Sequence, residues 1–337
     1  MTLRSSSKLS ASLFNLIIYT KQDSRIDYIH SVLETIVEKI PCHIIFISVD
    51  DSAPTDYFST STSAMNNHPF NANMAYDIFA ISCSVAQRDK IPFILLPKLI
   101  SDVPIYLLWA DDLDIEDTIF CNLSAMSSRV IFDSEITDNI HTFAKNVVRL
   151  HEHQKYEIAD LNWARLDFIR SILANSVNYS LYLESLTRTA QIEVEYNNKP
   201  SLFFTHPSLQ ALYLQNWVAN CLGWKSKGVS NPSLFLYEYE NQEKLSHLKE
   251  NYRDNFPTGM VLSLRLSVSS EEYISLCLKY GPLTQIEVKL SCQKECPMPQ
   301  NFILPKTKSG QSLINTIFGR GCSSHYFDVL KNLSLNH

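Results

Sequence analysis

The first third of the chain alternates short apolar runs with stretches of helical periodicity. Residues 12–20 (SLFNLIIYT) form an apolar run that predicts a strand. Residues 25–40 repeat apolar side chains every three or four positions, as one face of a helix does, and Pro41 ends that helix. Residues 42–50 are almost continuously apolar, which is typical of a strand buried on both faces of a parallel sheet. Together these segments predict a βαβ unit.

The alternation continues to about residue 153 after one interruption. Residues 51–73 are rich in Ser, Thr, Asn, Asp and Pro, and we predict a long mobile loop there. The elements that follow complete a doubly wound, mostly parallel α/β domain with helices on both faces. We predict strands at 76–86, 103–109 and 128–134, and helices at 93–100 and 114–124. A further helix begins at a cap formed by Ser134 or Thr137 and runs to about residue 153.

The second half of the chain is richer in strands. Residues 159–189 have helical periodicity with Asp160 as the expected N-cap, so we predict a long helix that connects two domains. Short turns between strands, such as Gly281-Pro282, predict a mainly antiparallel sheet in an α+β domain. The predicted domains are residues 1–153 and 154–337. The second contains strands at 190–196, 232–240, 259–268, 271–280 and 284–292, and helices at 206–222 (ended by Gly223), 311–317 and 324–330.

Composition and charge exclude several classes of protein. Hydrophobic residues make up 45% of the chain, enough for a packed core, and the net charge of −6 argues against a nucleic-acid or membrane-surface partner. The apolar run at 13–19 is shorter than the core of a signal peptide, and no later run reaches the roughly 20 residues of a membrane span. The eight cysteines are scattered, mostly inside apolar runs, so we expect buried thiols in a reducing cytoplasm.

Glycine is absent from the predicted α/β domain, since all seven glycines lie at Gly223 or later. A phosphate-binding loop needs glycine because the backbone must approach the anion without a Cβ and adopt positive φ. The domain therefore cannot build a GxGxxG or Walker loop, and a GxSxG nucleophile elbow is absent for the same reason. The short GRG at residues 319–321 follows no strand and predicts a turn between two helices.

No group of residues has the spacing of a metal or catalytic site. Cys292 and Cys296 have no second Cys pair at ligand spacing, so we expect a strand end and not zinc. His151 and His153 point to different faces of a helix. The acidic residues at 111–114 lack the glycine and terminal Glu of a calcium loop and are expected to cap a helix at Ile115. We predict no cofactor, metal or catalytic residue.

Three segments carry unusual combinations of Pro, Trp and Arg, at residues 90–112, 127–135 and 160–173. Trp109 ends a buried strand at its carboxyl end, where open α/β sheets place their functional crevice. Trp163 and Arg165 follow on the predicted linking helix. Core packing explains both tryptophans, and a partner-binding or ligand-binding surface is the alternative, because Trp and Arg are common anchors of interfaces.

These segments resemble the glucose-6-phosphate dehydrogenase assembly proteins, the OpcA family, over nearly the whole chain. The resemblance rests on the stretch LLPKLISDVPIYLLW (95–109), on RVIFDS (129–134), and on DLNWARL (160–166). IEVEY (192–196), the W-x-A-x-x-L-G-W pattern at 217–224, and a final helix with Tyr326 and Leu330 are also similar. The chain departs from the family pattern at Leu108, where a second Trp is usual, and at residues 323–325, where an Asp is usual.

The resemblance implies a non-catalytic protein that assists the assembly, oligomeric state or activation of glucose-6-phosphate dehydrogenase. The alternative is an enzyme or sensor that binds a sugar phosphate or nucleotide at the carboxyl edge of the first sheet through Lys98, Arg129 or Arg165. The oligomeric state of the chain itself is not predicted. Our candidates for the partner interface or its support are Asp102, Trp109, Asp133, Ser134, Asp160, Trp163 and Arg165.

Overall fold

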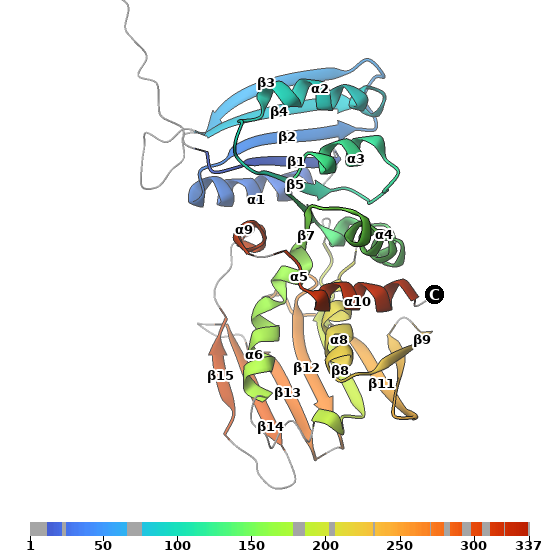
Figure 1. Ribbon diagram of the computed structural model, residues 1–337. Coiled ribbons are helices and arrows are strands. Elements are labelled where there is room, and N and C mark those ends of the chain that lie inside the picture. The colour runs from blue at the N-terminus through green and yellow to red at the C-terminus, as the bar shows by residue number, and fades with distance from the viewer. Residues whose placement is uncertain are drawn as a thin grey trace, which may run out of the picture. The chain divides into compact units, whose positions relative to one another are not determined.

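The computed structural model divides the chain into two compact units, each built around its own sheet (Figure 1). The first unit comprises residues 1–133, 150–161 and 308–321, and the second comprises 134–149, 162–307 and 322–337. The boundary expected at residue 153 stays a prediction. The structure describes residues 12–21, 25–65, 76–177, 186–201, 206–231, 233–269, 271–279, 284–291, 298–304, 311–319 and 321–335.

The first unit contains a seven-stranded sheet of order β3-β4-β2-β1-β5-β6-β7. All neighbouring strands pair in parallel except β3, which is antiparallel to β4. The predicted mostly parallel α/β sheet is therefore confirmed. Its strands are β1 (Asn15–Lys21), β2 (His43–Asp50), β3 (Phe58–Met65), β4 (Tyr76–Ser84), β5 (Ile105–Ala110), β6 (Arg129–Phe132) and β7 (Glu157–Asp160).

The helices of the first unit come from both ends of the chain. One face of the sheet packs Leu16 and Ile18 with the buried side of α1, and Leu313 and Ile317 of α9 join the same core. Helix α9 therefore returns to the first unit from a position far along the chain. The elements are α1 (Ile26–Lys39), η1 (Val85–Lys90), α2 (Ile91–Leu95), η2 (Leu96–Lys98), α3 (Thr118–Ala125) and α9 (Gln311–Phe318), and α4 (Ile140–His153) runs from the second unit into the first.

Arg129 holds the end of α9. Its buried guanidinium donates to the carbonyl oxygens of Thr316 and, at 2.9 Å, Ile317, and its Nε donates to Glu157 at 2.9 Å. The last carbonyls of a helix have no partner within the helix, and a cation placed there also meets the negative end of the helix dipole. A single side chain at the start of β6 thus ties a distant helix to the sheet.

Several local predictions are wrong. Residues 58–65, expected in a mobile loop, form the edge strand β3, whose polar Ser and Thr side chains suit a strand exposed to solvent. Asp160, expected to cap a helix, is the last residue of β7. Over the described residues up to 177, the predicted long helix is divided into two short ones. Asp117 caps α3 by accepting from the backbone N–H of Ile119 at 2.8 Å, and Asn139 takes the corresponding role in α4.

The second unit contains an eight-stranded sheet of order β15-β14-β13-β12-β8-β11-β10-β9. Neighbouring strands are antiparallel except β8 and β11, so the predicted mainly antiparallel sheet is confirmed. Its strands are β8 (Gln191–Asn197), β9 (Lys225–Asn231), β10 (Leu234–Tyr239), β11 (Gln242–Asn251), β12 (Val261–Ser267), β13 (Tyr273–Lys279), β14 (Gln285–Ser291) and β15 (Gln300–Ile303).

Helices cover one face of this second sheet. Helix α8 packs against β8 and β11 (Figure 1). Ile192 and Val194 of β8 are fully buried. Gly223 follows α8 with φ of +72°, as expected of a glycine that ends a helix. The helices are α5 (Leu161–Arg165), α6 (Asp167–Val177), α8 (Leu209–Cys221) and α10 (Ser324–Leu335).

No helix in the described ranges is both long and apolar enough to cross a bilayer. The cysteines are less uniform than expected. Cys42 and Cys83 are buried, and burial raises the pKa of the Cys42 thiol to about 12, whereas Cys121 and Cys221 are exposed. The predicted strand end at Cys292 and Cys296 and the turn at Gly281-Pro282 lie outside the described residues.

Arg129→Ala should destabilise the first unit by about 3 kcal/mol, because it leaves two buried carbonyl oxygens at the end of α9 without a donor. Urea unfolding of the full chain measures the loss, and hydrogen exchange of the α9 amides localises it. The control Lys145→Ala removes an exposed cation from α4 and should change stability by less than about 0.5 kcal/mol. Equal effects of the two substitutions would refute the assigned role of Arg129.

Candidate functional site

The strand order of the first sheet reverses between β1 and β5. From β1 the chain proceeds through β2 to β4 on one side, and from β5 through β6 to β7 on the other. Open α/β sheets bind their ligands outside the carboxyl ends of the strands at such a switch point. The side chains that gather at the ends of β1, β5 and β6 therefore form the candidate site.

A buried ion pair spans this switch point. Arg25, at the start of α1, is 3% exposed, and its guanidinium donates to a carboxylate oxygen of Asp133, which is 2% exposed and directly follows β6. Because β5 lies between β1 and β6, the pair crosses the carboxyl end of β5. The Asp133 backbone N–H donates to the carbonyl of Trp109 at 3.3 Å, and the Arg25 guanidinium lies 5.2 Å from the Tyr28 ring centre.

Trp109, whose carbonyl accepts from the backbone N–H of Asp133, is part of the core. It pairs with Tyr19 of β1 in register, and the two rings stack 4.2 Å apart at 5°. Phe120 of α3 packs edge-on at 5.0 Å, and the indole N–H donates to the Asp112 carbonyl at 3.1 Å. Burial raises the pKa of Tyr19 well above its ordinary value. Trp109 is only 1% exposed, so it can support a surface from behind but cannot present its ring to a partner.

Two further cations near this edge are also paired with carboxylates. Lys21, which ends β1, lies 3.0 Å from Asp111, whose pKa is raised by burial. Arg88 of η1 lies 2.8 Å from Asp117. A phosphate entering the crevice would have to displace a carboxylate from each of these cations, and it would also have to separate the buried Arg25–Asp133 pair. The arrangement is therefore poorly suited to binding an anion.

Of the cations that we proposed for phosphate binding, the two in the first unit do not lie at this edge. Arg129 lies at the amino-terminal start of β6, at the opposite end of the strand from Asp133, and its guanidinium is engaged with α9 and Glu157. Lys98 is exposed on η2, with its ammonium 5.1 Å from the Phe79 ring centre. Arg165 belongs to the second unit.

In the second unit, four polar side chains from two of the sequence motifs form one network. Arg165 donates to Glu135 at 2.9 Å and to the side-chain oxygen Oδ1 of Asn162 at 2.6 Å, and the side-chain amide of Asn162 donates to the Ser134 hydroxyl at 3.1 Å. Ser134, Glu135 and Asn162 are buried. The sequence predicted Ser134 and Arg165 but missed Glu135 and Asn162. The signal was the pair of opposite charges in the motifs SSRVIFDSE and DLNWARL.

Trp163 is a second aromatic centre of the same unit and is 6% exposed. The Arg170 guanidinium lies 3.7 Å from its ring centre and also donates to its carbonyl at 2.8 Å. Tyr213 and Tyr326 pack around the indole at 6.3 and 5.4 Å. The family-like Tyr326 in the last helix and the tryptophan of the DLNWARL motif are therefore parts of one core. Asp160, at the end of β7, is completely buried.

Asp102 is the candidate that lies on the surface. It adopts φ of +64° in the turn before β5 and is exposed. The preceding residues expose large apolar side chains: Phe93 is 78% exposed and Leu96 54%. The inward side of α2 carries fully buried Ile91 and Leu95, so this helix is apolar on both faces. We call the exposed side chains of Val85, Phe93, Leu96 and Ile100 the apolar segment.

The histidine cluster at the end of α4 gives no metal site. Among the residues that the structure describes, no three His, Cys, Asp or Glu side chains converge as metal ligands. His141 contacts the Leu333 carbonyl of α10 through Nδ1 at 2.7 Å, within the second unit. His151 and His153 are exposed at the end of the helix.

Arg25→Leu should destabilise the protein by about 3–5 kcal/mol, because it leaves the Asp133 carboxylate buried without its cation. The double variant Arg25→Leu/Asp133→Leu should recover most of that loss, since no charge remains buried. Urea unfolding measures both. Arg88→Ala, which removes a partly exposed pair with Asp117, is the control and should cost less than about 1 kcal/mol. Failure of the double variant to recover stability would contradict the assignment.

Comparison with known proteins places these features in a family. Two family models match the chain, described as the glucose-6-phosphate dehydrogenase subunit N-terminal domain over residues 34–149 and the corresponding C-terminal domain over residues 156–312. Among curated proteins, the OxPP cycle protein OpcA of Synechococcus elongatus is 23% identical over 61% of this chain and 44% of its own length. The OxPP cycle protein OpcA of Synechocystis is 23% identical over 57% of this chain and 39% of its own length. The chain thus spans less than half the length of these relatives.

The similarity of this chain to solved structures is limited to the fold. A UDP-N-acetylglucosamine 3-dehydrogenase from Acidithiobacillus ferrooxidans matches with a TM-score of 0.50 and 10% identity, covering 96% of each chain. A 3-ketoreductase from Actinomadura kijaniata matches with a TM-score of 0.50 and 9% identity at the same coverage. At such low identity these similarities show a shared α/β architecture and nothing about activity. The two family models between them cover most of the chain, and the protein belongs to the glucose-6-phosphate dehydrogenase assembly protein family, OpcA.

Proposed function

We propose that this chain is a non-catalytic factor that binds glucose-6-phosphate dehydrogenase in the cytoplasm and assists its assembly or activation, in support of the oxidative pentose phosphate pathway. Membership of the OpcA family supports the choice of glucose-6-phosphate dehydrogenase as the partner. The observation that carries the non-catalytic part is the buried Arg25–Asp133 ion pair across the switch point of the first sheet. A Rossmann-like unit uses that position for its ligand, and this chain has no glycine before Gly223 with which to build a phosphate loop.

The apolar segment is the surface we assign to the dehydrogenase. A helix that is apolar all round is normally covered by other protein, yet α2 leaves Phe93 in solvent, as the following turn leaves Leu96. Leu96 and Ile100 belong to the stretch 95–109 that resembles the family, and the whole segment lies within the matched N-terminal domain. Asp102 follows the last residue of the segment and places an exposed carboxylate beside the apolar side chains. An apolar centre with a polar rim is the usual anatomy of a protein interface.

Mixing the purified chain with the glucose-6-phosphate dehydrogenase of the same organism should shift the elution volume of the dehydrogenase or change its KM. The double variant Phe93→Ser/Leu96→Ser should weaken binding at least about tenfold, because two anchoring side chains are lost. Leu335→Ser, which alters another exposed apolar residue at the end of α10, is the control and should bind normally. The absence of co-elution and of any kinetic change at micromolar concentration would refute the proposal.

The alternative function is a sensor that binds a sugar phosphate or a nucleotide. A thermal-shift panel of pentose-pathway metabolites and nucleotides distinguishes this sensor from an assembly factor. A ligand at 100 times its Kd stabilises a protein by about 2.7 kcal/mol, which is easily detected. Stabilisation by one of them, lost on mutation at the carboxyl edge of the first sheet, would favour the sensor over the assembly factor.

A further inference from the structure

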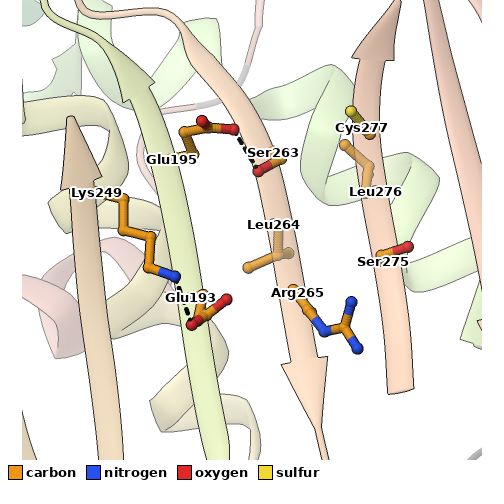
Figure 2. A pocket seen from close by; sticks show the side chains of 9 residues that line it. All are labelled: Glu193, Glu195, Lys249, Ser263, Leu264, Arg265, Ser275, Leu276 and Cys277. Carbon is orange, nitrogen blue, oxygen red and sulfur yellow. Dashed lines mark hydrogen bonds and ion pairs between the residues drawn. The ribbon is translucent and has the colours of Figure 1, made fainter. Parts of the chain in front are cut away.

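Among the residues that the structure describes, helices lie on only one face of the second sheet (Figure 1). Along β8 the buried Ile192 and Val194 alternate with Glu193 and Glu195, which are only partly buried and therefore point to the opposite face. Figure 2 shows the centre of that face, where charged side chains surround a hollow of about 270 Å³. Residues Glu193, Glu195, Lys249, Arg265 and Cys277 are among those that line it.

Opposite charges lie on the two strands at the middle of the sheet. The acidic Glu193 and Glu195 are on β8, and Arg265 is on β12, directly across from Glu193 in the register. Glu193 accepts from Lys249 at 2.8 Å, and the Arg265 guanidinium lies 3.9 Å from the Tyr273 ring centre. Four strands lie on the β8 side of this midline and four on the β12 side.

This arrangement is complementary to a copy of itself. A twofold axis that runs along the strands between β8 and β12 places β8 of one copy over β12 of the other and overlaps all eight strands. The axis preserves height along the strands, so Glu193 of each copy faces Arg265 of the other. The same rotation places β11 over β13, so that Lys249 lies over the small side chain of Cys277 and the hollow beside it.

The size of the face also suits a dimer. Strands of about seven residues at roughly 3.3 Å per residue, spaced about 4.8 Å apart over eight strands, give roughly 800 Å² per copy. That is the usual area per partner of a specific interface. We propose that this chain forms a twofold dimer through the open face of its second sheet, centred on reciprocal Glu193–Arg265 contacts. The proposal concerns the chain alone and does not depend on the dehydrogenase.

Light scattering during gel filtration at about 1–50 μM should give the mass of a dimer for the unmodified chain. Glu193→Arg places two arginines against each other across the interface, and Arg265→Glu places two glutamates there, so each variant should dissociate at least about tenfold more readily. Glu152→Arg, at an exposed position in the first unit, makes the same charge change and should remain dimeric. Melting temperatures of all variants verify folding.

Mixing the two variants tests the proposed contact between copies most directly. In a mixed dimer the arginine introduced at position 193 faces the glutamate introduced at position 265, and the unchanged Glu193 and Arg265 face each other at the second contact. Positions 193 and 265 are also neighbours within one chain, and each variant keeps two like charges there. Mixing does not remove that repulsion, so it restores only the contact between copies. Recovery of the dimer mass only in the mixture would establish the interface.

Three outcomes would each overturn the proposal: a monomeric unmodified chain, a dimer unaffected by both reversals, or no recovery on mixing. If the reversals instead abolish dehydrogenase binding by a monomeric chain, the face belongs to the dehydrogenase. The self-association proposal then fails, whereas the proposed function stands.

Discussion

The requirement that a buried guanidinium must have an oxygen partner shapes this protein at both ends of its first sheet. At the carboxyl edge Arg25 meets Asp133, and at the amino edge Arg129 meets the carbonyls that end α9. Leaving such a charge unpaired costs several kcal/mol, so each contact locks together elements distant in the sequence. The first contact occupies the position of a ligand crevice, and the second brings the C-terminal helix α9 into the N-terminal core.

The tryptophans show how a family-like motif can be structural. Trp109 and Trp163 are each packed among aromatic rings and nearly inaccessible to solvent. Their surroundings, a stacked Tyr19 in one case and a covering Arg170 guanidinium in the other, hold the end of β5 and the start of α5 rigid. A surface built on such rigid supports loses little conformational entropy when it binds a partner.

The exposed surfaces of the two units differ in chemistry. The first unit presents large apolar side chains on and around a short helix, whereas the open face of the second sheet presents opposite charges in register. Apolar contacts supply most of the affinity of an interface, and charge patterns mainly supply specificity and orientation. This contrast is the reason for proposing a different partner for each surface, the dehydrogenase for the apolar segment and a second copy for the sheet.

The hydrophobic pattern by itself determined the type and position of elements such as β1, α1, β5 and α8. Helix α1 buries one face and repeats apolar residues every three or four positions, whereas β1 and β5 are short, almost continuous apolar runs because both faces of the sheet are covered. The distribution of glycine likewise excluded a phosphate loop. Only the tertiary structure decided that 58–65 is an edge strand, that α9 packs in the first unit, and that Arg25 pairs with Asp133. Polar edge strands carry no periodic signal, and a pairing across 108 residues depends on strand order, which local sequence does not encode.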